Sequence, residues 1–242
     1  SPHCVFDYSY FGLVMFRVYF KGGYIDENDK GAIIERLANN PYVVSIYELS
    51  GEFDLAIEIE SKNPSRFNKE LKNVADVIPT LNNYKVLLNI VTHLYPKKYL
   101  LREIDDLSIP EQEIIVGGDR EVQSFTEDEM RLMRSLLHSP KKRLTRLAKD
   151  SGMNVKTAVN LIAKLRERKI IRGFKYLVAN DKLGISRFRL FLRLHNMSKE
   201  RDSQLLSFMM KTQEIVSVNK TVGDWDMEVD IESTDPSRIR LI

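Results

Sequence analysis

The stretch FTEDEMRLMRSLLHSPKKRLTRLAKDSGMNVKTAVNLIAKLRERKIIRGFKYLV, residues 125–178, decides the fold of this chain. Apolar residues recur in it at helical spacing in three successive segments, which are 125–137, 144–151 and 154–168. A short turn that contains Gly152 separates the second segment from the third. Three helices with this spacing are typical of a helix-turn-helix.

The ends of these helices carry capping signals. Glu129 follows Thr126 by three residues, as in a capping box, and Asn154 is a favourable N-cap for the third helix. The run 170–178 is interpreted as a β-ribbon, the wing. The sequence therefore predicts a winged helix-turn-helix.

Positive charge is concentrated in this segment. Residues 124–178 hold fourteen Lys or Arg and five Asp or Glu, a net charge of +9, whereas the whole chain has a net charge of +3. The remainder of the chain is therefore acidic, at −6. A basic segment in an otherwise acidic chain predicts a polyanionic partner, and here double-stranded DNA.

Nine side chains are candidates for contacts with DNA. Four lie opposite the apolar stripe of the third helix, near the end that would enter a major groove: Lys156, Thr157, Asn160 and Lys164. Asn can pair with adenine, and Lys can reach the acceptors of guanine. Five more are expected on phosphates: Lys141, Lys142, Arg143, Arg172 and Lys175. The competing interpretation is that these residues form solvated faces of a small helical domain.

Residues 12–94 have the pattern of a ferredoxin-like βαββαβ domain, an antiparallel sheet with both helices on one face. Strands are predicted at 12–20, 42–49, 55–60 and 84–93, and helices at 26–40 and 64–78. The third of these strands alternates apolar residues with Ala56, Glu58 and Glu60, which predicts that one of its faces is in water.

The same pattern returns at an offset of 172 residues without a gap. Gly12 aligns with Gly184 and Ile59 with Ile231, and the register still holds where Arg66 aligns with Arg238. A register held over this length indicates a tandem duplication.

The duplication divides the chain into five parts. They are a remnant of a first winged-helix module (1–11), a ferredoxin-like effector and dimerisation domain (12–94), a linker (95–123), the winged helix-turn-helix (124–180) and a second ferredoxin-like domain (181–242). Because Ile242 aligns with Glu70, the second domain is expected to be incomplete and the sequence to be a fragment. The predicted fold class is α+β.

Composition excludes several classes of protein. No apolar run reaches membrane-spanning length, no signal peptide is recognisable, and a single cysteine, Cys4, allows no internal disulfide. The chain is therefore expected to be cytoplasmic. The four His residues are scattered, so no metal site, cofactor or catalytic group is predicted.

A family resemblance rests on two turns and the helix-turn-helix. The turn Thr221–Asp226, which contains Val-Gly-Asp-Trp-Asp, and its counterpart Ser50–Asp54 match a Gly-x-x-Asp turn. Together with the adjoining winged helix, they resemble the leucine-responsive regulator/AsnC family of transcription regulators. Ordinary members have one such module, whereas this chain looks like two in series.

The resemblance implies an oligomer and a small effector. In the family the ferredoxin-like domains dimerise sheet against sheet, and effectors, often amino acids, bind near the Gly-x-x-Asp turn. The implied effector-binding residues here are Gly51, Asp54, Gly223 and Asp226. The competing interpretation is structural, with Gly at positive φ and Asp capping the turn. The two units could pair within one chain or each with a second chain, as a homo-oligomer.

Three functions remain open at this point. The first is a sequence-specific DNA-binding transcription regulator tuned by a small metabolite. The second is an enzyme like the sirohaem decarboxylases, which resemble the family but act on tetrapyrroles and would need His and Arg along the domain interface. The third is an effector-sensing module with a vestigial helix-turn-helix. The basic third helix and the scarcity of His favour the regulator.

Overall fold

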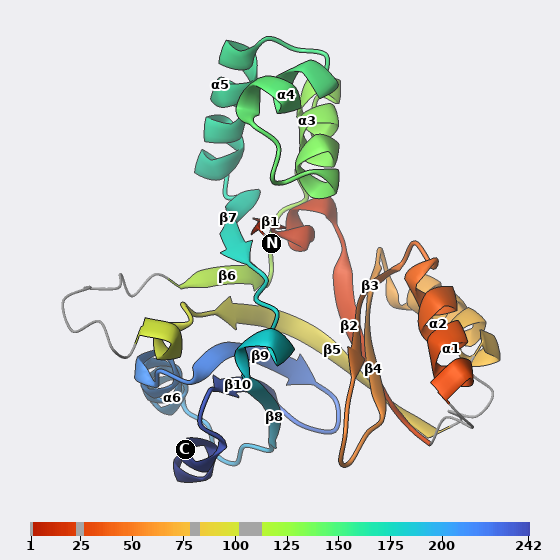
Figure 1. The fold of residues 1–242 in the computed structure, drawn as a ribbon, viewed down its shortest axis with the longest axis vertical. Coiled ribbons are helices and arrows are strands. Elements are labelled where there is room, and N and C mark those ends of the chain that lie inside the picture. The colour runs from red at the N-terminus through yellow and green to blue at the C-terminus, as the bar shows by residue number, and fades with distance from the viewer. Residues whose placement is uncertain (1, 23–26, 78–82, 102–112) are drawn as a thin grey trace.

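The computed structural model describes residues 2–22, 27–77, 83–101 and 113–242 (Figure 1). A domain of three helices stands above two units in which helices cover a sheet. The start of the predicted helix 26–40, the end of the helix 64–78 and much of the linker 95–123 lie outside the described residues.

The three-helix domain consists of α3 (Glu127–His138), α4 (Leu144–Asp150) and α5 (Val155–Glu167). The predicted capping box is confirmed, because the Thr126 side chain accepts from the Glu129 amide and the Glu129 side chain accepts from the Thr126 amide. Asn154 caps α5 by accepting from the amide of Thr157 at 2.7 Å. The helices enclose a core of buried side chains, which are Leu132, Met133, Leu136, Leu147, Ala148, Ala158, Leu165, Ile170 and Ile171.

Residues 170–178, predicted to be a β-ribbon, do not supply both of its strands. They contribute one strand, β7 (Ile171–Tyr176), which pairs antiparallel with β1 (Pro2–Phe6) from the start of the chain. The run contains no turn that could return the chain on itself within nine residues, so its partner must come from elsewhere. Residues 2–6, which lie within the expected remnant 1–11, therefore complete this ribbon.

The first unit has the predicted βαββαβ order. Its elements are β2 (Val14–Lys21), α1 (Glu27–Ala38), β3 (Val43–Glu48), β4 (Leu55–Ser61), α2 (Pro64–Val77) and β5 (Asn83–Leu94). All strand pairs are antiparallel, in the spatial order β3-β4-β2-β5, and both helices lie on one side (Figure 1). Apolar side chains of the strands and of α1 and α2 form its core.

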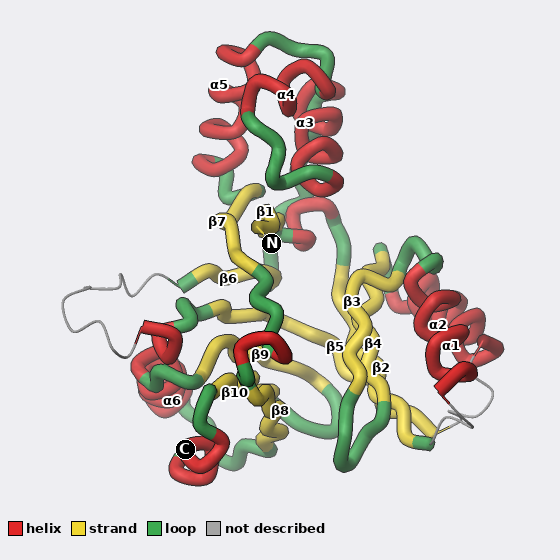
Figure 2. The backbone as a smooth tube through the Cα atoms, in the orientation of Figure 1, coloured by secondary structure: helices red, strands yellow, loops and turns green. Residues whose placement is uncertain are grey.

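The second unit repeats the βαββ part of this order. Its elements are β8 (Ser186–Leu192), α6 (Lys199–Lys211), β9 (Ile215–Val222), β10 (Met227–Ser233) and the 3-10 turn η4 (Pro236–Leu241). Strand β9 also pairs with β5, and β6 (Ile114–Gly117) pairs with β5, so both units belong to one eight-stranded sheet (Figure 2). None of the helices in the described ranges is long and apolar enough to span a membrane.

The two units pair with each other inside one chain. Arg17 on β2 forms an ion pair with Glu228 on β10, and the Tyr19 hydroxyl donates to Glu228 at 2.7 Å. The sheet faces that carry these side chains therefore face each other, away from the helices. Of the two alternatives that the sequence leaves open, pairing within the chain is the one observed.

This pairing overturns the prediction of a wet face on β4. Ala56 is 1% exposed and Glu58 is 6% exposed, because the second unit covers that face. The alternation of apolar and polar residues is present, but its polar side is the interior between two units and not solvent. A pattern of period two identifies two faces without saying what covers either.

The outer face of the second unit is less covered than that of the first. Phe16 and Val18 are 7% and 0% exposed, and Phe16 stacks on Phe67 of α2. Their counterparts at the 172-residue offset, Phe188 and Leu190, are both 46% exposed. The 3-10 turn η4 stands at the sequence position at which α2 begins in the first unit.

Candidate functional site

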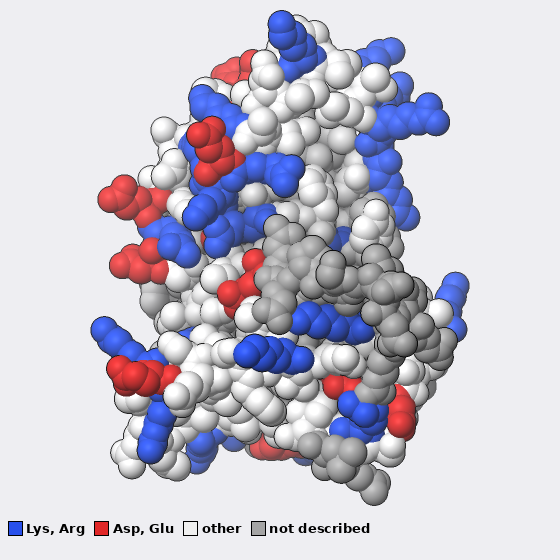
Figure 3. Space-filling view, turned by 90° about the vertical axis from the view of Figure 1, so that its left-hand side faces the viewer, with Lys and Arg blue, Asp and Glu red and all other residues white. Residues whose placement is uncertain are grey.

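Helix α5 presents the predicted recognition residues on its outer face. Lys156, Asn160 and Lys164 are exposed, while the apolar stripe of α5 faces the core of the domain. Thr157 is half-buried, and its amide is bonded to the N-cap Asn154. Figure 3 shows Lys and Arg side chains gathered over the upper, three-helix part of the molecule. This face has the shape and charge of a helix that can enter a groove of DNA.

The loop between α3 and α4 adds cations beside α5. Lys141, Lys142 and Arg143 are all exposed there. Lys142 forms an exposed ion pair with Asp150 at 2.7 Å, an interaction that is weak in water. These three side chains can therefore reach phosphates.

Two of the nine predicted DNA-binding residues lie elsewhere. The Arg172 guanidinium turns inward, donates to the carbonyl of Ile115 and lies 3.6 Å from the carboxylate of Asp7. Lys175, near the end of β7, lines a cavity below the three-helix domain. Neither side chain belongs to the basic face of α5, because their strand runs away from it into the sheet units.

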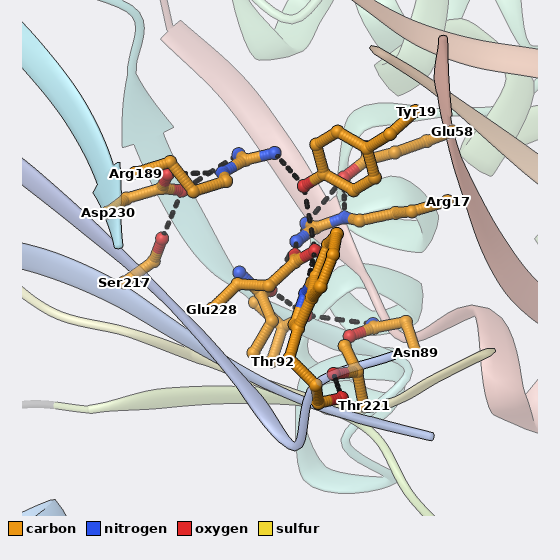
Figure 4. Close-up of polar contacts among 12 residues, drawn as sticks. Arg17, Tyr19, Glu58, Asn89, Thr92, Arg189, Ser217, Thr221, Glu228 and Asp230 are labelled. Carbon is orange, nitrogen blue, oxygen red and sulfur yellow. Dashed lines mark hydrogen bonds and ion pairs between the residues drawn. The ribbon is translucent and has the colours of Figure 1, made fainter. Parts of the chain in front are cut away.

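The interface between the two units holds a polar network with internal symmetry (Figure 4). The Arg17 Nε donates to Glu58 at 2.8 Å, and the Arg189 Nε donates to Asp230 at 2.7 Å. Arg189 and Asp230 stand 172 residues after Arg17 and Glu58, so the two ion pairs occupy matched places. All four side chains are at least nine-tenths buried.

Tyr19 and Glu228 join the two halves of this network (Figure 4). The Tyr19 hydroxyl accepts from Arg189 at 2.8 Å and donates to Glu228, which also binds Arg17. Burial would raise the pKa of Glu58, but Arg17, Ser45 and Arg189 together outweigh it and hold that pKa below its usual range. Burial likewise opposes ionisation of Asp230, and Arg189 with Arg187 keeps its pKa far below normal. The carboxylates therefore stay charged at neutral pH.

The sequence gives a faint signal for this network that was missed. Arg17 and Arg189 are matched in the two repeats, and each stands between apolar residues in the middle of a strand. A charge kept inside a strand in both copies indicates a buried partner, here the acid on the neighbouring strand.

The two Gly-x-x-Asp turns are built in the same way. The Asp54 carboxylate accepts from the amide of Gly22 at 2.9 Å, and the Asp226 carboxylate accepts from the amide of Leu194 at 2.7 Å. Asp54 and Asp226 are 172 residues apart in the sequence, and so are Gly22 and Leu194. Each Asp thus ties its turn to the end of the first strand of its unit, which is a structural role.

The glycines of these turns have different surroundings. Gly51 and Gly223 both have positive φ, at 118° and 153°. A Cβ on Gly51 would meet open space, whereas one on Gly223 would lie 3.0 Å from the carbonyl oxygen of Val86 on β5. The second turn therefore packs closely against the first unit at its glycine, whereas Gly51 of the first turn has no such contact.

This difference gives a testable expectation. Replacing Gly223 with Ala should lower the free energy of unfolding by about 1–3 kcal/mol more than replacing Gly51 with Ala, because only the former overpacks the contact with β5. Urea unfolding of both variants measures the difference. Equal losses would mean that the turn can move off β5 at no cost.

Two known proteins are similar to part of this sequence. No family model matches the sequence. The HTH-type transcriptional regulator FL11 of Pyrococcus abyssi is 32% identical over 110 residues, which are 46% of this chain and 72% of that protein. The regulator of the same name from Pyrococcus horikoshii is 31% identical over 107 residues, 44% of this chain and 70% of that protein.

A solved structure resembles the chain over nearly its whole length. The siroheme decarboxylase NirDL, in complex with an iron-uroporphyrin III analogue, has a TM-score of 0.59 at 13% identity and covers 99% of this chain and 68% of its own. At this identity the similarity shows a shared fold. The sequence identity to the two regulators, extending over more than two thirds of each, shows that this chain belongs to the leucine-responsive regulator/AsnC family of HTH-type transcriptional regulators.

Proposed function

We propose that this chain is a sequence-specific DNA-binding regulator of transcription, in which α3, α4, α5 and β7 act as a winged helix-turn-helix. The observation that carries the proposal is the exposed face of α5 with Lys156, Asn160 and Lys164, on a domain with a net charge of +9. Asn160 and Lys156 would contact bases, and Lys141, Lys142 and Arg143 would contact phosphates.

The experiment is selection of bound duplexes from a random-sequence pool, followed by titration of the enriched site at two salt concentrations. The double substitution Lys156→Ala and Asn160→Ala should weaken specific binding by about 2–5 kcal/mol, the sum of two base contacts. Lys211→Ala on α6 is the matched control, because it removes the same charge from an exposed position outside the three-helix domain. A control that weakens binding as much would reduce the proposal to non-specific attraction.

The internal symmetry supports a built-in pseudo-dimer derived from a duplication. The two Gly-x-x-Asp turns match each other at the 172-residue offset, and the ion pair Arg17–Glu58 matches Arg189–Asp230 in the same way. In the ribbon, His3 pairs with Lys175, its own counterpart, so a local two-fold axis passes through that pair. This arrangement would stand in for the sheet-to-sheet dimer of ordinary members, and larger homo-oligomers remain compatible with it.

A small metabolite such as an amino acid is the second part of the proposal. Gly51, Asp54, Gly223 and Asp226 are the residues that the family resemblance points to. Because both carboxylates already hold their own turns, we expect an effector to use backbone groups of the turns rather than the Asp side chains. Repeating the titration with a pool of amino acids tests this part: an unchanged affinity would remove it.

The likeness to siroheme decarboxylase NirDL keeps a tetrapyrrole enzyme as the alternative. The interface between the units does contain Arg17 and Arg189, but both are neutralised by buried carboxylates, and no His takes part in the network drawn in Figure 4. An absorbance titration with iron-uroporphyrin III separates the two functions. A saturable spectral shift with loss of carboxylate groups would favour the enzyme, and Lys156 and Asn160 would then be dispensable.

A further inference from the structure

A cavity of about 540 Å³ lies beneath the three-helix domain. Three parts of the chain meet around it: the end of β5, the inner face of the second unit, and residues 174–178, which lead out of the three-helix domain. Its apolar walls are Leu94, Ile114, Phe174, Leu177, Val178 and Val216. A cavity of this size and lining suits a small organic molecule.

Three cations also line this cavity. Lys97, Lys175 and Arg187 border it, with Glu232 as the acidic lining residue. Glu232 is bound by Lys97 and accepts from the Tyr99 hydroxyl at 2.7 Å, so it does not neutralise the other two. Arg187 gives one NH group to Asp230 at 3.0 Å, and its side chain is 39% exposed. Within the described ranges no carboxylate lies at ion-pair distance from Lys175.

The repeat provides an internal comparison for this site. At the 172-residue offset His3 stands where Lys175 is, and Met15 stands where Arg187 is. Glu60 stands where Glu232 is, and burial with the nearby Glu58 raises the pKa of Glu60 to about 7. Only the second copy of these positions is therefore cationic. The fold does not require cations here, since the first unit forms without them.

We propose that this cavity binds a small amphipathic organic anion, with its acidic group on Lys175 and Arg187 and its apolar body against the walls. The site differs from the Gly-x-x-Asp turns, which lie at the opposite end of β5. Gly223 approaches Val86, whereas the cavity begins at Leu94, roughly 25 Å further along an extended strand.

A ligand in the cavity would affect the position of the helices that are proposed to bind DNA. Phe174, Leu177 and Val178 form part of its wall and follow α5 directly in the chain. A ligand that packs against them favours one placement of the three-helix domain over others and so changes DNA affinity. This coupling rests on the proposed function, whereas the binding site does not.

The test uses two fluorescent probes with the same aromatic body. 1-Anilinonaphthalene-8-sulfonate carries an acidic group, and N-phenyl-1-naphthylamine lacks it. We expect the anionic probe to saturate at one site per chain, and Lys175→Met and Arg187→Met each to weaken it about tenfold, the loss of one charge-assisted hydrogen bond. The neutral probe should change by less than twofold in both variants. Lys211→Met, which removes an exposed cation from α6, should behave as wild type.

Other outcomes overturn the proposal in distinct ways. If the anionic probe did not saturate, or if the substitutions weakened both probes equally, the cavity would bind through its apolar walls alone. Its cations would then make no contribution to binding. Lys175→Met serves as the variant that breaks no ion pair, so its result stands even where Arg187→Met unfolds. A saturating anionic probe should change the affinity for the selected DNA about fivefold or more, and an unchanged affinity would refute the coupling. Failure to select any DNA sequence would refute the proposed function and leave the probe binding intact.

Discussion

Replacing Arg17 with Met is expected to lower the free energy of unfolding by about 3–5 kcal/mol. The Arg17 side chain is 6% exposed and binds Glu58 from its own unit and Glu228 from the other. Its loss leaves two carboxylates in the interior without the guanidinium that binds them, and much of their desolvation is then uncompensated. Urea unfolding at neutral pH measures the loss.

Arg187→Met is the control for this experiment. Its side chain is 39% exposed, and Asp230 keeps Arg189 as a partner when Arg187 is removed. The expected loss is about 1 kcal/mol. Equal losses in the two variants would show that the interior between the units is wet enough to solvate lone carboxylates.

The pH dependence of the Arg17 variant has a definite sign. In the wild type the pKa of Glu58 is lowered, so its contribution to stability is present above the unfolded pKa and lost only as the pH falls through the folded value. Without Arg17, burial raises that pKa, and the contribution of Glu58 is lost as the pH rises. The free energy of unfolding that Arg17→Met loses relative to the wild type should therefore be smaller at pH 5 than at pH 7.5. Glu60, with a pKa of about 7, titrates in both proteins and largely cancels in the difference.

Local features of the fold could be predicted because their causes are local. The capping box at Thr126, the N-cap Asn154 and the apolar stripe of α5 depend on residues within one helix. The βαββαβ order follows from periodicity, and the 172-residue offset strengthened it by giving two copies of the same pattern. The exposed basic residues of α5 were found because a recognition helix needs an apolar face on one side and a polar face on the other.

The features that were missed depend on contacts between distant segments. The partner of β7 comes from residues 2–6, and the polar face of β4 is covered by the other unit. Arg172 was expected on a phosphate, but Asp7 and Ile115 hold it inside. No pattern within one strand reveals such a partner. Comparison of the repeats was the available signal, because Arg17 and Arg189 keep a charge between apolar neighbours at matched positions.

Trp225 is the other position where a large effect is expected. It is 5% exposed. Its ring contacts Phe191 of its own unit, at 4.3 Å between ring centroids, and Tyr19 and Phe53 of the first unit, at 5.4 and 5.9 Å. This aromatic cluster joins the units at the end opposite β1 and β7. Trp225→Ala should lower the free energy of unfolding by about 3–5 kcal/mol, because it leaves a cavity between the units.

Trp225→Phe is the matched variant, since Phe53 occupies the equivalent position of the first unit. It keeps most of the aromatic contact and loses the hydrogen bond from the indole Nε1 to Glu228, 3.1 Å long. That carboxylate still accepts from Tyr19, so a loss of only about 1–2 kcal/mol is expected. Urea unfolding followed by the circular dichroism of the helices measures the free energy of unfolding of both variants. This signal does not depend on the tryptophan that is removed. If Trp225→Ala proved no worse than Trp225→Phe, the units would be held together by their shared sheet and polar network, and the aromatic cluster would only fill space.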